Sequence, residues 1–180
     1  MRLGFRTLGS VFVLFVMGLG GLRVPLAAGP EAAMERVRIT ETRDGIPLWD
    51  VEADNAEVFE ERGIAVLTRV VQPVRIVIYQ SEERLTSYAH TVVVDLKTKD
   101  LELIGQVRSE SSAGTRIFSE RMRWSADKRH ITTDLPVVVE KGGLHIRGRG
   151  MVADTVLGRM TIREQVSSEI TLAERPERQR

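Results

Sequence analysis

The sequence contains no cysteine, and only 5% of its 180 residues are aromatic. The absence of cysteine excludes disulfide bonds, thiolate metal ligands, thiol nucleophiles and the cysteine through which a lipoprotein is anchored. The scarcity of aromatic residues means that a core must be built mainly from valine, isoleucine, leucine and alanine. That set of residues is weighted toward strands, so the composition favours a β-structure.

The chain also lacks an excess of either charge, because 26 basic residues stand against 25 acidic ones and the net charge is +1. No block of like charge is long enough to follow a polyphosphate backbone, so we expect no nucleic-acid partner. Once an N-terminal segment is set aside, roughly 140 residues remain, which is enough for one well-buried domain and short for two.

Residues that commonly carry chemistry are present but are not grouped for it. The histidines, His90, His130 and His145, lack the spacing of a metal site such as His-x-His. The serine cluster around Ser111 has no histidine or lysine nearby that could act as a base. We therefore expect no catalytic residue, no metal and no cofactor, and we predict that the chain is not an enzyme.

The N-terminal segment has the pattern of a membrane anchor. Arg2 and Arg6 precede an uncharged run over residues 7–22, and the apolar residues 24–28 follow it. The combined length is adequate to cross a bilayer as a helix if Arg23 snorkels to the interface. With the basic flank kept in the cytoplasm, everything after this segment is exported.

The alternative for this segment is a cleavable signal peptide that ends at Ala28. The bulky Leu26 lies two positions before that site, where a small residue is preferred, so the pattern favours an uncleaved anchor. We assign residues 1–28 to the N-terminal membrane anchor and residues 29–33, which include glycine and proline, to a linker.

One pattern occurs four times in the rest of the chain. It consists of a small residue, an apolar residue three positions later, a second apolar residue two positions after that, and a valine further along. The copies are Ala53, Ala56, Val58 and Val71; Ala89, Val92, Val94 and Val107; Ser119, Met122, Trp124 and Val137; and Gly148, Met151, Ala153 and Val166. Each copy also has a further residue seven positions after the second apolar one, beyond a polar turn: Ala65, Leu101, Ile131 and Met160. Each copy therefore predicts a β-hairpin.

The step of three positions within each copy breaks strict alternation, which predicts a β-bulge that bends the strand. The longer first copy leaves room for an additional strand over residues 74–79, and Val37 and Ile39 indicate a first strand before the repeats. The predicted fold is an all-β, antiparallel, jelly-roll-like sandwich of stacked hairpins over residues 34–172. The charged tail at 173–180 is expected to be flexible.

Apolar residues of the predicted strands form either a plain core or, if the sandwich fails to close, a surface for acyl chains. The candidates are Val58, Val92, Val94, Leu101, Leu103, Met122, Trp124, Ile131, Met151 and Ile162. The first and last strands remain as unpaired edges that a partner could cover. The edge candidates are Val37 and Ile39 at the N-terminal side and Ile162 and Val166 at the C-terminal side.

Five segments carry a resemblance to a known family. They are Gly45-x-x-x-Trp49-x-Val51-x-Ala53-x-x-Ala56, Leu101-x-Leu103-x-Gly105-x-Val107, Ser119-x-x-Met122-x-Trp124, Thr132-Thr133-Asp134-x-Pro136-Val137 and Ile146-x-Gly148-x-Gly150-Met151-x-Ala153-Asp154. In this order, and behind a single N-terminal anchor, they resemble the LptC family of lipopolysaccharide-export proteins. The hairpin repeat is shared with the periplasmic bridge protein LptA, but the anchor and the length of one domain favour LptC.

The resemblance implies a twisted β jelly roll whose apolar interior receives the acyl chains of lipopolysaccharide. It also implies three partners: lipopolysaccharide, the inner-membrane ABC transporter that extracts this lipid, and LptA, to which the lipid passes. The location that it implies is the inner membrane of a Gram-negative bacterium, with one membrane span and the C-terminal domain in the periplasm. A scaffolding β-repeat protein is the alternative, while a carbohydrate-binding or hydrolytic jelly roll would need aromatic clusters or paired carboxylates that the sequence does not offer.

Overall fold

The structure is a computed structural model that describes residues 29–79, 83–155 and 158–170. Its strands are β1 (Ala32–Arg43), β2 (Ile46–Phe59), β3 (Ile64–Thr68), β4 (Val74–Tyr79), β5 (Arg84–Ala89), β6 (Thr91–Asp95), β7 (Leu101–Ser111), β8 (Arg116–Ser125), β9 (His130–Lys141), β10 (Leu144–Asp154) and β11 (Arg159–Ile170). In the described ranges, no helix is long and apolar enough to cross a membrane. The expected anchor at 1–28 and the tail at 173–180 lie outside the described residues. β1 already includes Ala32 and Ala33, which the sequence analysis assigned to the linker.

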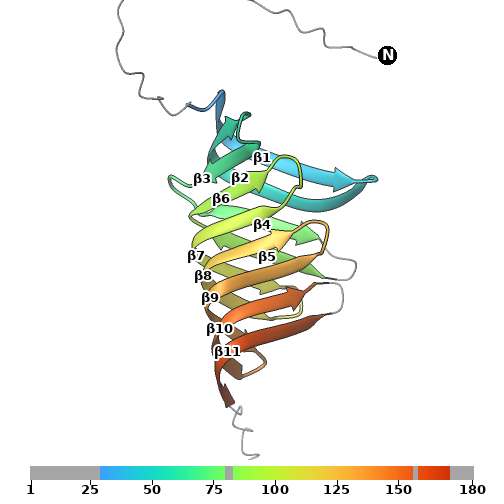
Figure 1. The fold of residues 1–180 in the computed structure, drawn as a ribbon, viewed down its shortest axis with the longest axis vertical. Coiled ribbons are helices and arrows are strands. Elements are labelled where there is room, and N and C mark those ends of the chain that lie inside the picture. The colour runs from blue at the N-terminus through green and yellow to red at the C-terminus, as the bar shows by residue number, and fades with distance from the viewer. Residues whose placement is uncertain (1–28, 80–82, 156–157, 171–180) are drawn as a thin grey trace, which may run out of the picture.

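All of these strands pair antiparallel in one sheet, in the order β11-β10-β9-β8-β7-β5-β4-β2-β3-β6, with β1 beside β2 and a further pairing of β6 with β7. Figure 1 shows them stacked along the long axis, with β1 near one end and β11 at the other. The prediction of an all-β antiparallel fold is confirmed. Both layers belong to this one sheet, because the long strands bend and continue from one layer into the other.

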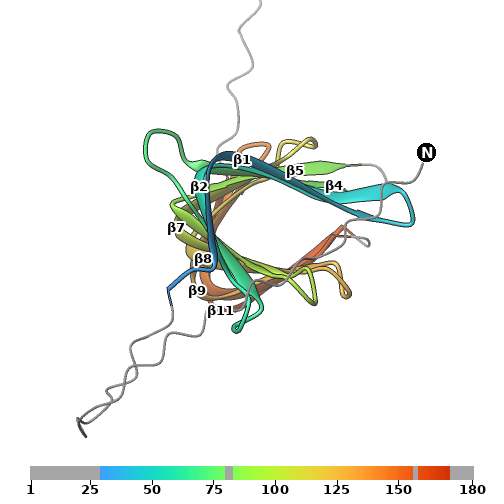
Figure 2. The ribbon, with the colours of Figure 1, turned by 90° about the horizontal axis from the view of Figure 1, so that it is seen from above.

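The sheet forks between β2 and β7 into two walls. β2 pairs with β4 through residues 49–52 and with β3 through 55–59, while β7 pairs with β6 through 101–104 and with β5 through 108–111. We name the layers the β4–β5 wall and the β3–β6 wall after the strands that lie in only one of them. From β7 onward each long strand gives one half to each wall. Figure 2 shows the walls meeting along the side where these strands bend.

The bends fall where the repeat predicted bulges. One register shift lies within residues 119–123 of β8 and another within 149–151 of β10, and in the second copy the strand is interrupted at His90 between β5 and β6. Gly105 lies at the matching shift in β7 with φ of +82°, a conformation that glycine adopts without strain. The three-residue step of the repeat is therefore the sequence signal for the bend at which a strand passes from one wall into the other.

The predicted hairpins are confirmed, because the turns at 60–63, 95–100, 125–130 and 154–159 each join consecutive strands. The additional strand is β4, and the first strand is β1. Val71 in the first copy is the exception, since it lies outside any strand and is 77% exposed. The side chain of Val166, the valine of the fourth copy, lies outside the described residues.

Asp54 explains why Val71 leaves the strand pattern. Its Oδ2 accepts hydrogen bonds from the N–H groups of Val70 at 2.6 Å, Val71 at 2.7 Å and Gln72 at 3.3 Å. These donors hold residues 70–72 as a loop between β3 and β4, and they favour the carboxylate, which lowers the pKa of Asp54. A single acidic side chain at the bend of β2 thus replaces the sheet ladder for this segment.

Candidate functional site

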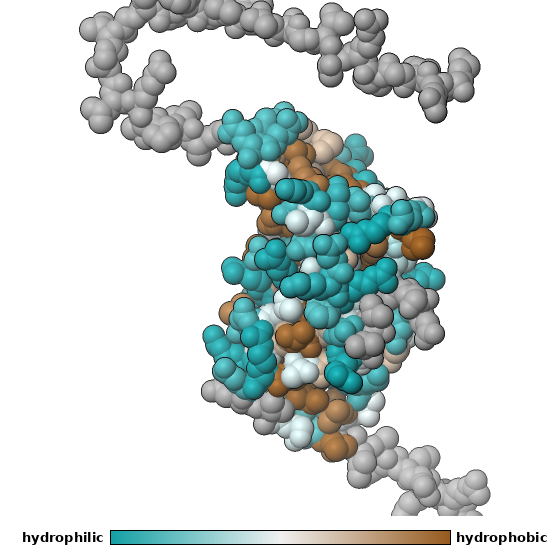
Figure 3. Space-filling model, turned by 45° about the vertical axis from the view of Figure 1, so that its right-hand side comes forward, coloured by the Kyte–Doolittle hydropathy of each residue, from teal (hydrophilic) through white to brown (hydrophobic). Residues whose placement is uncertain are grey.

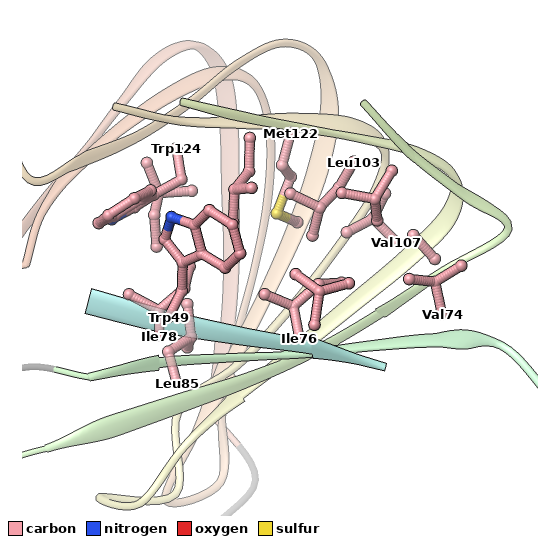
Figure 4. Close-up of a cluster of buried hydrophobic side chains, with 14 of the residues drawn as sticks. Trp49, Val74, Ile76, Ile78, Leu85, Leu103, Val107, Met122 and Trp124 are labelled. Atoms are coloured by element: carbon pink, nitrogen blue, oxygen red, sulfur yellow. The ribbon is translucent and has the colours of Figure 1, made fainter. Parts of the chain in front are cut away.

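The apolar rows of the two walls face each other and form one interior. In Figure 4, Trp49, Ile76 and Ile78 from the β4–β5 wall point toward Leu103, Met122 and Trp124 from the β3–β6 wall. Each of these six side chains is at most 2% exposed. Because residues alternate between the faces of a strand, the charged neighbours of these residues lie on the outer faces. The result is a mainly apolar interior between two polar surfaces.

The ten candidates from the sequence all belong to this interior. Eight are buried, and two, Val58 and Ile162, are partly buried and pack against the rest. The structure brings them together as one cluster, which the side chains of the opposite wall cover.

Sequence reasoning missed the half of the interior that the β4–β5 wall supplies. These residues are Trp49, Val51, Ile76, Ile78, Leu85, Ile117 and Val139. The signal was present as strict alternation in Val74-x-Ile76-x-Ile78 and in Trp49-x-Val51. The repeat pattern drew attention to the other wall because the conspicuous apolar pairs of each copy lie beyond the bend.

The interior becomes less covered toward both ends of the stack. Val37 and Ile39 of β1 are only partly buried, as are Ile146 of β10 and Met160 and Ile162 of β11. At the extremes, Met34 is 44% exposed and Ile170 is 67% exposed. Figure 3 shows apolar side chains at the surface near the end of the molecule that carries β11. The apolar interior therefore runs from one edge strand to the other and is partly open at each.

The two edge strands lie where the sequence analysis expected them. Within the described residues, β1 pairs only with β2, and β11 pairs only with β10. The four edge candidates are on these strands, Val37 and Ile39 on β1 and Ile162 and Val166 on β11.

Two indole N–H groups differ in their environment inside the interior. Trp49 Nε1 donates to the carbonyl oxygen of Lys99 at 3.1 Å, across from one wall to the other. Trp124 Nε1 is buried and has no hydrogen-bond partner among the described residues. The indole N–H of Trp49 is thus satisfied within the chain, whereas the unpaired buried donor of Trp124 carries a cost in stability.

Several buried polar groups pair with each other or with the backbone. The hydroxyls of Ser87 and Ser109 lie 2.7 Å apart, and Ser119 donates to the carbonyl oxygen of Pro136 at 2.9 Å. Neither contact includes a base, so these hydroxyl groups satisfy one another or the backbone inside the fold. In the described part of the chain, no group of three or more acidic, histidine or cysteine side chains could hold a metal ion.

A buried acid on the outer face fixes the N-terminal edge. Asp50 is 7% exposed, and its Oδ2 accepts hydrogen bonds from Tyr79 Oη at 2.7 Å and Arg38 Nη2 at 3.4 Å. Hydrogen bonds from Thr40 and Tyr79, followed by the interaction with Arg38, lower the pKa of Asp50, whereas the carboxylate raises the pKa of Tyr79. The cluster joins β1 to β2 and β4.

Comparison with known proteins agrees with this architecture. The sequence model of the family described as "Lipopolysaccharide-assembly, LptC-related" matches residues 12–171. Among solved structures, the chain is similar to LptH of Pseudomonas aeruginosa, the LptA-homologous periplasmic component of the lipopolysaccharide transport device, with a TM-score of 0.55 and 18% identity over 69% of this chain and 95% of that one. At this identity, the likeness to LptH shows the fold alone.

No curated protein sequence matches the chain. The family match, however, covers most of the 180 residues and includes all the strands that form the interior. The family is a non-enzymatic part of lipopolysaccharide transport, which agrees with the prediction that the chain is not an enzyme. The chain belongs to the LptC family and takes part in lipopolysaccharide transport.

Proposed function

We propose that the chain binds the acyl chains of lipopolysaccharide between its two walls and passes the lipid from the inner-membrane ABC transporter to LptA. The observation that carries this proposal is the continuous apolar interior, which begins at Val37 and Ile39 on one edge strand and reaches Met160 and Ile162 on the other. A path that is apolar from edge to edge and partly open at both ends suits a lipid that arrives at one end and leaves at the other.

The energetics of such a path are suited to transit. Burial of each methylene group of an acyl chain is worth about 0.8 kcal/mol. When the walls part to admit the chain, however, side chains such as Ile76 and Met122 lose contacts of the same kind, because they are fully packed in the absence of lipid. The exchange of one apolar contact for another leaves a small net binding free energy, so the lipid can also be released.

The family assignment supports a location and an arrangement along the chain. Residues 1–28 are assigned to a single anchor in the inner membrane, and the domain that begins with β1 at Ala32 is assigned to the periplasm. In this arrangement the anchor brings β1 close to the membrane, because β1 is the first strand after it.

The edge strands give the proposed transfer its direction. Exposed strand edges are ready to pair with a strand of another protein. β1, with Val37 and Ile39, faces the transporter, and β11, with Ile162 and Val166, faces LptA. The match to the LptA homologue LptH supports this arrangement, since two domains of one fold can stack edge to edge into a longer sheet with a continuous interior.

A scaffolding role without lipid transfer is the second candidate. It is favoured by the burial of eight of the ten interior candidates, because a packed interior is what any stable domain needs. The two functions differ in whether the walls ever separate around a lipid.

Photocrosslinking in cells tests the proposal. A photoreactive residue placed at Val94, Leu103 or Met122 in the interior should capture lipopolysaccharide while the transporter is active. One placed at Lys97 or Lys128, in exposed turns, should not. A scaffolding protein would give equal labelling at both classes of position, or labelling at neither.

A further inference from the structure

The side of the molecule opposite the bends is the mouth between the two walls. There the β1–β2 turn ends the β4–β5 wall, and the β6–β7 and β8–β9 turns end the β3–β6 wall. Three contacts cross the mouth: Trp49 Nε1 to the carbonyl oxygen of Lys99 at 3.1 Å, Lys99 Nζ to Glu41 Oε2 at 3.4 Å, and Arg43 Nη2 to Asp127 Oδ1 at 3.3 Å. We call these three contacts the latch.

The sequence of β1 explains why its end reaches the opposite wall. Val37 and Ile39 are partly buried against the interior, and the alternation of the strand puts Glu41 on the same side. The side chains of β1 that point toward the interior thus change from apolar, at Val37 and Ile39, to charged, at Glu41, beside the turn that carries Lys99. The carboxylate of Glu41 is only 23% exposed there.

Hydrogen bonds to Asp95 hold the turn that carries Lys99. Asp95 Oδ1 accepts hydrogen bonds from the N–H groups of Lys97 at 2.9 Å and Thr98 at 2.7 Å, and Lys99 itself has φ of +67°. This geometry fixes the direction of the Lys99 carbonyl, which accepts the indole N–H of Trp49. The contact is therefore made by a preformed acceptor and by a fully buried donor.

Asp100 joins the two turns of the β3–β6 wall. Asp100 Oδ1 accepts the N–H of Ala126 at 2.9 Å, and Asp100 Oδ2 pairs with Arg123 at 3.3 Å. Asp127, the partner of Arg43, follows Ala126 directly. A single acid thus connects the part of the latch at Lys99 with the part at Asp127.

The latch covers only the N-terminal half of the interior. Beneath it Trp49, Ile78 and Trp124 are at most 2% exposed, whereas Ile146, Met160 and Ile162 in the C-terminal half are only partly covered. The turns of the β4–β5 wall at 111–116 and 141–144 form hydrogen bonds only within that wall, as far as the described residues go. Closure of the mouth is therefore a property of one end of the stack.

We propose that this latch is a gate that must open sideways for lipid to pass along the N-terminal half of the interior. The inference rests on the proposed function. A lipid whose acyl chains lie between the walls keeps its charged and sugar-bearing headgroup in water, because burial of that group is prohibitive. The junction between headgroup and chains then lies in the mouth, and movement from β1 toward β11 carries it through the latch.

The test joins the walls covalently and asks whether lipid still reaches the interior. Because the chain has no cysteine, the full-length double variant Glu41→Cys with Lys99→Cys can be linked across the mouth by a short bismaleimide. The matched control is Glu102→Cys with Arg121→Cys, an ion pair of 3.5 Å between neighbouring strands of one wall. Both variants carry a photoreactive residue at Met122, and capture of lipopolysaccharide is measured in cells with and without the linker.

The gate predicts that linking residues 41 and 99 lowers capture at Met122 at least about tenfold, while the linked control keeps its capture within about twofold. Equal capture by both linked proteins would overturn the gate and leave the proposed function intact, since lipid would then pass with the mouth closed. Failure of the unlinked proteins to capture lipopolysaccharide at Met122 would overturn the proposed function and the gate together.

Discussion

Replacing Gly105 with alanine should destabilise the fold through two separable effects at the bend of β7. Gly105 has φ of +82°, where an L-residue is strained. A Cβ atom added there would also lie 2.9 Å from His90 Nδ1 and 3.0 Å from His90 Cβ and Cγ. The Cβ and Cγ atoms of His90 cannot shift easily, because the backbone N–H of His90 donates to the carbonyl oxygens of both Ile104 and Gly105 at 3.1 Å.

The two effects differ in size. Strain at positive φ costs about 1–2 kcal/mol, of which roughly 0.4–1 kcal/mol is offset because alanine restricts the unfolded chain. Overpacking adds about 1–3 kcal/mol, so Gly105→Ala should lower the free energy of unfolding by roughly 2–4 kcal/mol. Gly114→Ala is the matched control, since Gly114 has φ of +78° and no atom within 4 Å of an added Cβ. It should show only the strain, about 1 kcal/mol.

Urea unfolding of the full chain in detergent, followed by the fluorescence of the buried Trp49 and Trp124, measures these differences. The double variant His90→Ala with Gly105→Ala should recover about 1 kcal/mol relative to the sum of the single variants, because it removes the close contacts with Nδ1 and Cγ but neither the contact with Cβ nor the strain. If Gly105→Ala cost no more than Gly114→Ala, or if His90→Ala gave no recovery, the close approach of the strands at this bend would be refuted.

Two further predictions concern the loop at Asp54 and the C-terminal edge. Because hydrogen bonds from Val71, Val70 and Gln72 hold the pKa of folded Asp54 below its ordinary value of 3.8, the stability that it contributes is complete above that pH and is lost as the pH falls through the folded value. In the variant Asp54→Asn, the free energy of unfolding should therefore depend less on pH at acid pH, and the amide protons of Val70 and Val71 should exchange faster. Unchanged amide exchange would refute this role of Asp54. Ile162→Pro removes a backbone donor of β11, so a folded variant should lose binding to LptA and keep the transporter, and the reverse result would show that the two edges are assigned backwards.

The sequence could predict the hairpins and their bends because both depend on local patterns. The three-residue step at Ser119 and at Gly148 interrupts alternation within a few residues, and a register shift is its direct result. The sequence could not predict that β4 and β5 lie in only one of the two walls. This depends on which half of β2 pairs with β4 and which half of β7 pairs with β5. The sequence pattern also failed at Val71, where the carboxylate of Asp54 competes with sheet pairing.

The sequence could predict the ten interior candidates as a group, but it could not predict whether they form a closed core or an open groove. A closed core and an open groove need the same residues, such as Leu103 and Met122, so a pattern cannot distinguish them. The latch was beyond the sequence for a different reason. Glu41 and Lys99 are far apart along the chain, and only the twist of the two walls brings them within 3.4 Å.

The central claim, that acyl chains lie between the walls, can be tested through the tryptophans, because the chain has only two and both are in the interior. A lipid A analogue with bromine on its acyl chains quenches an indole on contact, whereas an analogue with bromine on its headgroup reaches only the outside. The account predicts that bromine on the acyl chains quenches the fluorescence of both Trp49 and Trp124. The single variants Trp49→Phe and Trp124→Phe separate the two signals. Bromine on the headgroup should leave the fluorescence of Trp124 unquenched. Saturating binding without quenching by acyl bromine would contradict the account.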